Sequence, residues 1–367
     1  MTTTAARTFT GALVAAASAL TPAGAVTPAL ATAVTVAASV PAAVRHERPR
    51  LVPRLPAPPV ALRHDPAPLA GPRGRTLWAV PGSQAAQAAE RLRTSRPDDA
   101  ALLARMAATP TALWVGDWTP RATVGATIRR ALAPALAHGA VVTLVLYAVP
   151  QRDCAKAGLP DGAAYRGWVD AVARAVAGAP AIVVLEPDAL SLTDCLAPAG
   201  AAERSALLRY AVERLSHGST WVYLDVGHSR WRPPADVAVR LRAAGVERAR
   251  GFALNVANFG STAEQVAYGH QVSDALGEPT PFVVDVGRGG RGPGEGELAW
   301  CNPPGRALGA APTTSAPDEL VDALLWVKPP GESDGSCRPG APPAGEFWVD
   351  YALGLARTAG WQAPPRR

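Results

Sequence analysis

Acidic and amide side chains follow the short apolar runs of this sequence, one run after another. In chain order they are Asp117, Asp153, Glu186, Asp188, Asp225, Asn255, Asn258, Asp285, Glu332 and Asp334. A single acid at such a position commonly caps the helix that follows it. Helix capping does not account for so many carboxyl and amide groups with aromatic residues beside them. The pattern therefore predicts a carboxylate-lined cleft.

These residue types suit a neutral substrate with many hydroxyl groups. Asp, Asn and Lys side chains form hydrogen bonds with hydroxyls, and tryptophan rings offer apolar faces to the C–H faces of sugars. Hydrolysis of a glycosidic bond needs one carboxyl group that stays protonated and a second group that activates water. A neighbouring carboxylate is one way to raise the pKa of the first group. We therefore expect glycoside hydrolysis.

Such a site needs a scaffold that gathers the strand ends. Seven apolar runs are continuous rather than alternating, as expected of parallel strands covered on both faces; they are residues 111–115, 141–149, 181–185, 220–225, 251–256, 281–286 and 323–327. Helix-like segments fall at residues 121–138, 162–178, 201–216, 235–247, 262–276 and 346–358. This alternation predicts an α/β fold, a parallel, distorted barrel of about seven strands with the active site at the C-terminal strand ends.

Six stretches of the chain carry a recognisable combination of motifs. They are Tyr147 with Arg152-Asp153-Cys154, Glu186-Pro187-Asp188-Ala189-Leu190, Asp225-Val226-Gly227-His228, Asn255-Val256-Ala257-Asn258-Phe259, Trp300-Cys301-Asn302-Pro303, and Lys328-Pro329-Pro330-Gly331-Glu332-Ser333-Asp334-Gly335. In type and order they resemble glycoside hydrolase family 6, the inverting cellulases and cellobiohydrolases. The resemblance covers roughly residues 75–360.

The resemblance implies a role for each matching residue. Asp188 is expected to be the general acid, Asp153 the neighbour that raises its pKa, and Asp334 the base, acting directly or through water. The residues expected to contact the sugar chain are Tyr147, Asp225, Trp231, Asn255, Asn258, Trp300, Lys328 and Glu332. Tryptophan is also common in protein cores, so a core role for Trp231 and Trp300 is the alternative, and Trp114 and Trp118 stay open between the two.

The four cysteines are Cys154, Cys195, Cys301 and Cys337. An even number in an exported chain favours two disulfides. Three connectivities are possible, of which Cys154–Cys195 with Cys301–Cys337 is the simplest and the one that the resemblance implies. No CxxC spacing occurs, so a thiolate zinc site is not expected. The acids form no credible set of metal ligands either, so we expect no metal.

The chain before residue 74 has a different composition. Residues 1–33 contain an apolar run at 10–20 followed by small residues, which is typical of a secretory signal, with a disordered or membrane-associated segment as the alternative. Residues 34–73 are rich in Pro and Ala and predict a linker. We therefore expect a secreted protein with its catalytic domain at residues 74–364.

Charge and motif context exclude two other classes. The net charge of +6 comes from scattered arginines, with Lys only at Lys156 and Lys328, so nucleic-acid binding is not expected. Residues 287–292 match GxGxxG after a strand, but Pro293 follows where a dinucleotide site needs a helix to begin. We expect no cofactor, no obligate protein partner and a monomer.

Loop lengths bear on the mode of cleavage. Only two residues separate Asp334 from Cys337, and the loop after Cys154 is also short, which favours an open cleft. We therefore expect an endo-β-1,4-glucanase that cuts cellulose or a related β-1,4-glucan; a cellobiohydrolase is one alternative. An inactive glucan-binding protein is the other, because the loop after Cys154 lacks a serine that the family usually has, for which Asp161 or a backbone group would have to substitute.

Overall fold

The structure is a computed structural model that describes residues 70–155 and 157–363. The predicted signal at residues 1–33 and the predicted linker up to residue 69 lie outside the described residues. Within them, Trp221 Nε1 donates to the carbonyl of Ala70 at 2.6 Å, and Arg73 donates to the carbonyl of Ala316 at 3.1 Å. Residues 70–73 therefore contact the same domain as the strands.

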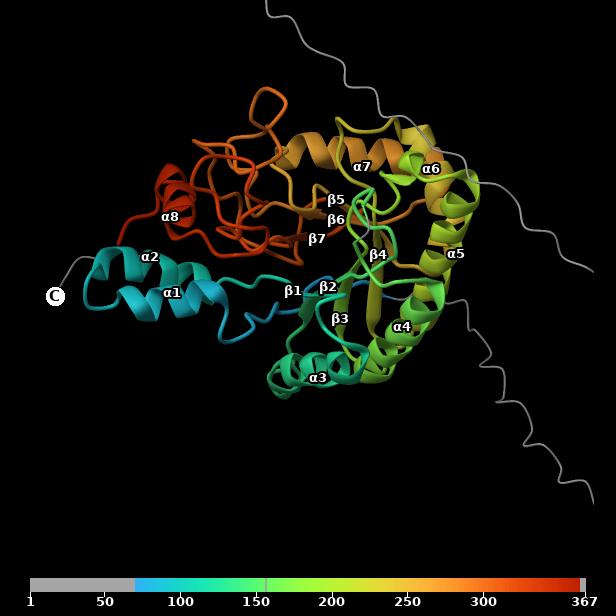
Figure 1. Cartoon of the computed structure of the whole chain (residues 1–367), viewed down its shortest axis with the longest axis horizontal. Helices are drawn as coiled ribbons and strands as arrows, with labels where there is room; N and C mark the ends of the chain where they lie inside the picture. The colour runs from blue at the N-terminus through green and yellow to red at the C-terminus, as the bar shows by residue number, and fades with distance from the viewer. Residues whose placement is uncertain (1–69, 156, 364–367) are drawn as a thin grey trace, which may run out of the picture. The chain divides into compact units, whose positions relative to one another are not determined.

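Seven parallel strands form one curved sheet in chain order (Figure 1). The strands are β1 (Leu113–Gly116), β2 (Val142–Tyr147), β3 (Ala181–Leu185), β4 (Thr220–Asp225), β5 (Gly251–Leu254), β6 (Phe282–Asp285) and β7 (Val321–Leu325). Each strand pairs with the next one along the chain. All seven predicted strands are present, and the predicted parallel α/β fold is confirmed.

The sheet curls into a distorted, incompletely closed barrel. In the described part of the chain, β1 and β7 are the two edge strands and have no ladder between them. The backbone N–H of Ala112 donates to the carbonyl of Trp326 at 3.0 Å, and Trp114 Nε1 donates to the carbonyl of Val327 at 2.9 Å. These bonds bring the two edges of the sheet together. Because all seven strands are parallel, their carboxyl ends lie at one rim of the barrel.

Both faces of the sheet are buried, which explains the continuous apolar runs. Alternate strand residues point to opposite faces, so Val145 and Val184 fill the barrel interior while Leu144 and Val183 pack against the helices. The helices that match the prediction are α3 (Arg121–Ala137), α4 (Gly162–Val176), α5 (Pro198–Leu215), α6 (Pro234–Ala243), α7 (Thr262–Leu276) and α8 (Val349–Thr358). In Figure 1, α3 to α7 lie around the outside of the sheet.

Two further helices, α1 (Gln84–Leu92) and α2 (Pro97–Ala108), precede β1 and were not predicted. The Ser83 hydroxyl accepts a hydrogen bond from the backbone of Ala86 and caps α1, while α2 begins at a proline, a residue favoured in the first turn. Arg96, which precedes α2, pairs with Asp350 of α8 at 3.4 Å. None of the helices within the described ranges is long and apolar enough to cross a membrane.

Candidate active site

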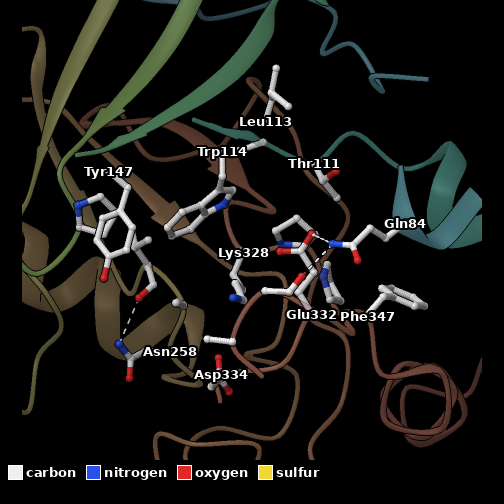
Figure 2. A pocket seen from close by; sticks show the side chains of 18 of the residues that line it. Gln84, Thr111, Leu113, Trp114, Tyr147, Asn258, Lys328, Glu332, Asp334 and Phe347 are labelled. Atoms are coloured by element: carbon white, nitrogen blue, oxygen red, sulfur yellow. Dashed lines mark hydrogen bonds between the residues drawn. The ribbon is translucent and has the colours of Figure 1, made fainter. Parts of the chain in front are cut away.

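A cleft of about 1440 Å³ lies at the carboxyl ends of the strands (Figure 2). Nine of the eleven predicted catalytic and sugar-binding residues line it: Asp188, Asp153, Asp334, Tyr147, Trp231, Asn258, Trp300, Lys328 and Glu332. Tyr147 is the last residue of β2, and the other eight come from the loops that follow β2 to β7. The cleft therefore gathers acids, amides and aromatic rings as the pattern predicted.

Asp188 is the acid best suited to donate a proton. It follows β3, and its backbone N–H donates to Asp225 Oδ1 at 2.8 Å, which fixes the turn. Burial and the nearby Asp153 carboxylate raise the pKa of Asp188 to about 7, because both disfavour the charged form. A carboxyl group with this pKa stays largely protonated in mildly acidic solution and still gives up its proton readily.

Asp153 is held by donors on both of its oxygens. Tyr147 Oη donates to Oδ1 at 2.6 Å, and Arg152 Nε donates to Oδ2 at 3.1 Å. Arg152 also donates to Asp117 at 2.7 Å, and its guanidinium lies 4.0 Å from the centre of the Tyr147 ring. These contacts fix the orientation of the Asp153 carboxyl group beside Asp188.

Asp225 lies behind Asp188 instead of lining the cleft. It is 1% exposed, and its Oδ1 also accepts from the backbone of Gly227 at 3.1 Å. Its Oδ2 has no hydrogen-bond partner within the described residues. Burial and Asp188 raise the pKa of Asp225 well above the ordinary range. The predicted sugar contact is not supported, and Asp225 acts on the backbone of Asp188.

Asn255 is also absent from the cleft wall. It is fully buried, with Nδ2 donating to the carbonyl of Asp285 at 2.7 Å and Oδ1 accepting from the backbone of Gly260 at 3.0 Å. Its backbone is left-handed, with φ of 64°. The amide is thus used to join the loops after β5 and β6, and the predicted sugar contact from Asn255 is not supported.

Asp334 and Arg288 form a buried ion pair on the β7 side of the cleft. Arg288 Nη1 lies 2.9 Å from both oxygens of Asp334, and the backbone N–H of Asn302 donates to Oδ2 at 3.0 Å. The Arg288 side chain is 1% exposed and the Asp334 side chain 6%. These hydrogen bonds fix the orientation of the Asp334 side chain at the cleft.

Lys328 and Glu332 lie together at one side of the cleft, with Trp114 and Gln84 around them (Figure 2). Lys328 Nζ lies 5.6 Å from the centre of the Trp114 ring and donates to the carbonyl of Ser333 at 3.3 Å. Gln84 Nε2 donates to Glu332 at 2.9 Å. Burial lowers the pKa of Lys328 and raises that of Glu332, and the attraction between the two charges opposes both shifts.

The tryptophans of the cleft differ in exposure. Trp300 is 53% exposed and Trp118 56% exposed, which excludes a core role for either one. Trp231 is half-buried, with its ring centre 5.6 Å from that of His228, and both line the cleft. Trp114 lines the cleft as well. All four rings can therefore reach a bound chain.

Two disulfides tie neighbouring loops at this rim. Cys154–Cys195 joins the loops after β2 and β3, and Cys301–Cys337 joins the loops after β6 and β7. The sequential pairing is confirmed. The bonds flank the two acids from which the chemistry is expected, Asp188 on one side and Asp334 on the other.

Three functional contacts were not predicted. Arg288 belongs to a glycine-rich stretch with no helix after it, Arg152 was noted only as part of a motif, and Gln84 lies at the start of the unpredicted helix α1. Asp161, considered as a substitute for the missing serine, is exposed and caps α4 by accepting from the backbone of Ala164 at 2.8 Å. No group of three His, Cys, Asp or Glu residues in the described ranges is arranged to hold a metal ion.

Comparisons with known proteins agree with this geometry. Residues 72–359 match the family model described as glycosyl hydrolases family 6. The chain is 45% identical over 266 residues to endoglucanase A of Cellulomonas fimi, covering 72% of this chain but only 57% of that protein. It is 39% identical over 278 residues to endoglucanase 1 of Streptomyces halstedii, covering 72% of this chain and 84% of that protein.

A solved structure gives a similar result. The endoglucanase Cel6 from Mycobacterium tuberculosis, in complex with methyl-cellobiosyl-4-deoxy-4-thio-β-D-cellobioside, superposes with a TM-score of 0.75 at 45% identity, over 80% of this chain and 99% of that one. Similarity thus extends along the whole barrel and includes a relative whose bound ligand is a cello-oligosaccharide analogue.

Proposed function

Because this chain belongs to glycoside hydrolase family 6, we propose that it is an endo-β-1,4-glucanase that cuts internal bonds of cellulose or a related β-1,4-glucan with inversion. The observation that carries the proposal is the pair of acids at the rim. Asp188 has a pKa raised to about 7, and Asp334 is oriented by its ion pair with Arg288 at 2.9 Å.

Asp188 protonates the oxygen of the leaving sugar. The Asp153 carboxylate keeps this proton on Asp188 until the bond breaks, and then stabilises positive charge that develops at the anomeric carbon. Tyr147, which donates to Asp153, also lines the cleft at this point. Proton transfer to the leaving oxygen and charge stabilisation thus come from one pair of loops.

Water attacks the opposite face of the sugar, as inversion requires. Asp334 is the acid that we assign to activate it, directly or through a second water. Both Asp334 oxygens already accept hydrogen bonds, from Arg288 at 2.9 Å and from the backbone of Asn302 at 3.0 Å, which favours a relay through a second water. Lys328, Glu332 and Asn258 supply hydrogen bonds for sugar hydroxyls, and Trp114, Trp231 and Trp300 supply apolar faces.

The mode of cleavage follows from the roof of the cleft. Short loops after Cys154 and Asp334 leave the cleft open, so that a long glucan can bind along its length. The relatives described above are also named endoglucanases. Release of cellobiose from chain ends is the competing activity. We further propose that the protein is secreted, since two disulfides suit an oxidising compartment, and that it acts as a monomer.

The test is hydrolysis of carboxymethyl cellulose by the full chain, followed by reducing-sugar release and viscosity. We expect a fall in viscosity that precedes most sugar release, α-anomeric products by proton NMR, and loss of activity of several orders of magnitude in Asp188→Asn. Cellobiose as the dominant early product would overturn internal cleavage. Binding of cellopentaose without turnover by the unaltered chain would overturn the enzyme proposal and favour a glucan-binding protein.

A further inference from the structure

Glu186 is a buried carboxyl group that the proposed mechanism does not use. Its side chain is fully buried, directly after β3. Oε2 accepts from the backbone of Ala148 at 2.9 Å and of Val149 at 3.0 Å, and Oε1 lies 3.1 Å from the backbone N of Ala148. Ala148 and Val149 begin the loop after β2, so a residue of one loop holds the backbone of the next.

Arg204 holds the same two loops from the helix layer. It lies on α5 and is 3% exposed. Nη1 donates to the carbonyl of Ala189 at 3.1 Å, in the loop after β3. Nη2 donates to the carbonyls of Pro150 at 2.8 Å and Gln151 at 2.9 Å, in the loop after β2. One guanidinium therefore spans both loops with three hydrogen bonds.

The backbone of these two loops is strained where they are held. Nine non-glycine residues of the described chain have left-handed φ, and five of them lie here, with φ between 50° and 66°: Gln151, Asp153, Cys154, Glu186 and Asp188. Such conformations persist only where surrounding contacts over-determine them. Asp153 and Asp188, the two acids whose closeness matters, are themselves in this set.

We propose that Glu186 and Arg204 form a buried brace that sets the position of the Asp153 carboxylate relative to Asp188, and that both are positioning residues for catalysis. Asp153 is two residues from Gln151, and Asp188 lies between Glu186 and Ala189 in the chain. Neither Glu186 nor Arg204 lines the cleft. This proposal rests on the proposed function, because the brace affects catalysis through the pKa of Asp188, the proposed general acid.

The charged and titratable neighbours define what the brace controls. Asp188 faces Asp153 and Tyr147 from β2 and its loop, and Asp225 from β4. Glu186 faces Arg152 from the β2 loop, Tyr165 from α4 and Arg204 from α5, as the charge effects on these groups indicate. If the loops separate, Asp188 loses both the repulsion from Asp153 and part of its burial, so its pKa falls.

The test compares Arg204→Lys and Glu186→Gln with the unaltered chain. The lysine keeps the charge of Arg204 but cannot reach three carbonyls, and the glutamine turns an amide NH₂ toward backbone N–H groups. The measurements are the ¹³C-carboxyl NMR titration of Asp188 and the pH profile of kcat/KM on cellopentaose. We expect both midpoints to move to lower pH, with kcat at pH 8 about ten- to a hundredfold lower and KM little changed.

Arg240→Lys is the matched control. Arg240 lies on α6, its side chain is 18% exposed, and it donates to the carbonyl of Leu190 at 3.1 Å in the loop after β3. Within the described residues, its hydrogen bonds go to that loop and to Asp236, and none goes to the loop after β2. We therefore expect Arg240→Lys to lower stability while keeping the Asp188 midpoint and the pH profile of the unaltered chain.

Two outcomes would overturn the proposal that Glu186 and Arg204 position the two acids. If Arg204→Lys and Glu186→Gln lose stability but keep the Asp188 midpoint, the two residues are only structural. If Arg204→Met shifts the midpoint and Arg204→Lys does not, charge and not position is responsible. Should the unaltered chain fail to hydrolyse cellopentaose, the proposed function fails, while the NMR titration and the amide exchange of Ala148 and Val149 still test the brace.

Discussion

At the scale of single residues, the site depends on three carboxyl groups in a row. Asp153 raises the pKa of Asp188, and Asp188 in turn raises that of Asp225. Like charges this close disfavour simultaneous ionisation, so the repulsion adds to burial in raising the pKa values of Asp188 and Asp225. Asp153 and Asp188 both line the cleft, and of these two Asp188 is the one whose raised pKa suits donation of a proton to a leaving oxygen.

The first prediction concerns the neighbour of the acid. Asp153→Asn removes the negative charge that keeps Asp188 protonated, so the pKa of Asp188 falls from about 7. Because activity needs protonated Asp188, the alkaline limb of kcat/KM should move to lower pH. A pH series on cellopentaose from pH 4 to 9 measures this, and an unchanged alkaline limb would show that Asp153 does not set the proton affinity of the acid.

The second prediction concerns the buried ion pair. Arg288→Met leaves the Asp334 carboxylate unpaired at a position where its side chain is 6% exposed, which should lower the free energy of unfolding by about 3–5 kcal/mol. Combining it with Asp334→Asn removes the stranded charge and should restore part of that loss. Urea denaturation of both single variants and the double variant measures the coupling, and strictly additive losses would contradict it.

Residue types and spacing predicted most of the cleft wall. Strand-end acids identified Asp188, Asp153 and Asp334 because parallel strands bring their carboxyl ends to one rim. The same rule placed five other side chains in the cleft that do not line it and bond backbone groups instead: Asp117, Glu186, Asp225, Asn255 and Asp285. The direction in which a strand-end side chain points depends on the geometry of the loop that follows, which residue spacing does not report.

At the scale of secondary structure, continuous apolar runs were enough to locate every strand. Helices α1 and α2 escaped because they precede the strand–helix alternation and, in α1, the buried side chains are only alanines, Ala85, Ala88 and Ala89. Missing α1 also meant missing Gln84, whose amide holds Glu332 at the cleft.

The third prediction tests how tightly the loop after β2 is packed. Gly158 has φ of +88°, and a Cβ there would meet the carbonyl oxygen of Val149 at 1.9 Å. Gly139, after α3, has φ of +64° with nothing within 4 Å. Gly139→Ala should cost about 1 kcal/mol for the left-handed backbone alone, and Gly158→Ala more, by roughly 1–3 kcal/mol from overpacking.

Thermal and urea unfolding of the two alanine variants compare these costs directly. The Gly158 backbone N–H also donates to Asp117 at 3.2 Å, and Asp117 holds Arg152 next to Asp153, so Gly158→Ala should lower kcat as well. Equal destabilisation of the two variants would mean that the loop moves aside freely, and would weaken the case for a fixed Asp153.

At the scale of the whole domain, the buried acids make the stability of the fold depend on pH. Burial raises the pKa of Glu186 and Asp188 to about 7 and that of Asp225 and Asp285 above the usual range. Each of these groups binds a proton more tightly in the folded chain than in the unfolded one. The acids with lowered pKa, such as Asp194 and Glu264, are near the surface, where ion pairs contribute little.

The fourth prediction is that the domain is most stable in mildly acidic solution. A carboxyl group whose folded pKa lies above its unfolded value contributes fully below the unfolded pKa, and that contribution is lost as pH rises through the window up to the folded pKa. For Glu186 and Asp188 this window runs from about 4 to about 7. Burial lowers the pKa of His228, which opposes the trend with a single group.

Urea unfolding at pH 5 and pH 8 measures the effect. We expect the unaltered chain to lose at least about 2 kcal/mol between these values, since each raised pKa corresponds to roughly 3 kcal/mol and the coupled acids do not add fully. Glu186→Gln should lose less over the same interval, because the amide does not ionise. Glu90→Gln, which changes an exposed carboxyl group on α1, controls for the lost charge. Equal slopes in all three proteins would show that the buried acids do not limit stability at neutral pH.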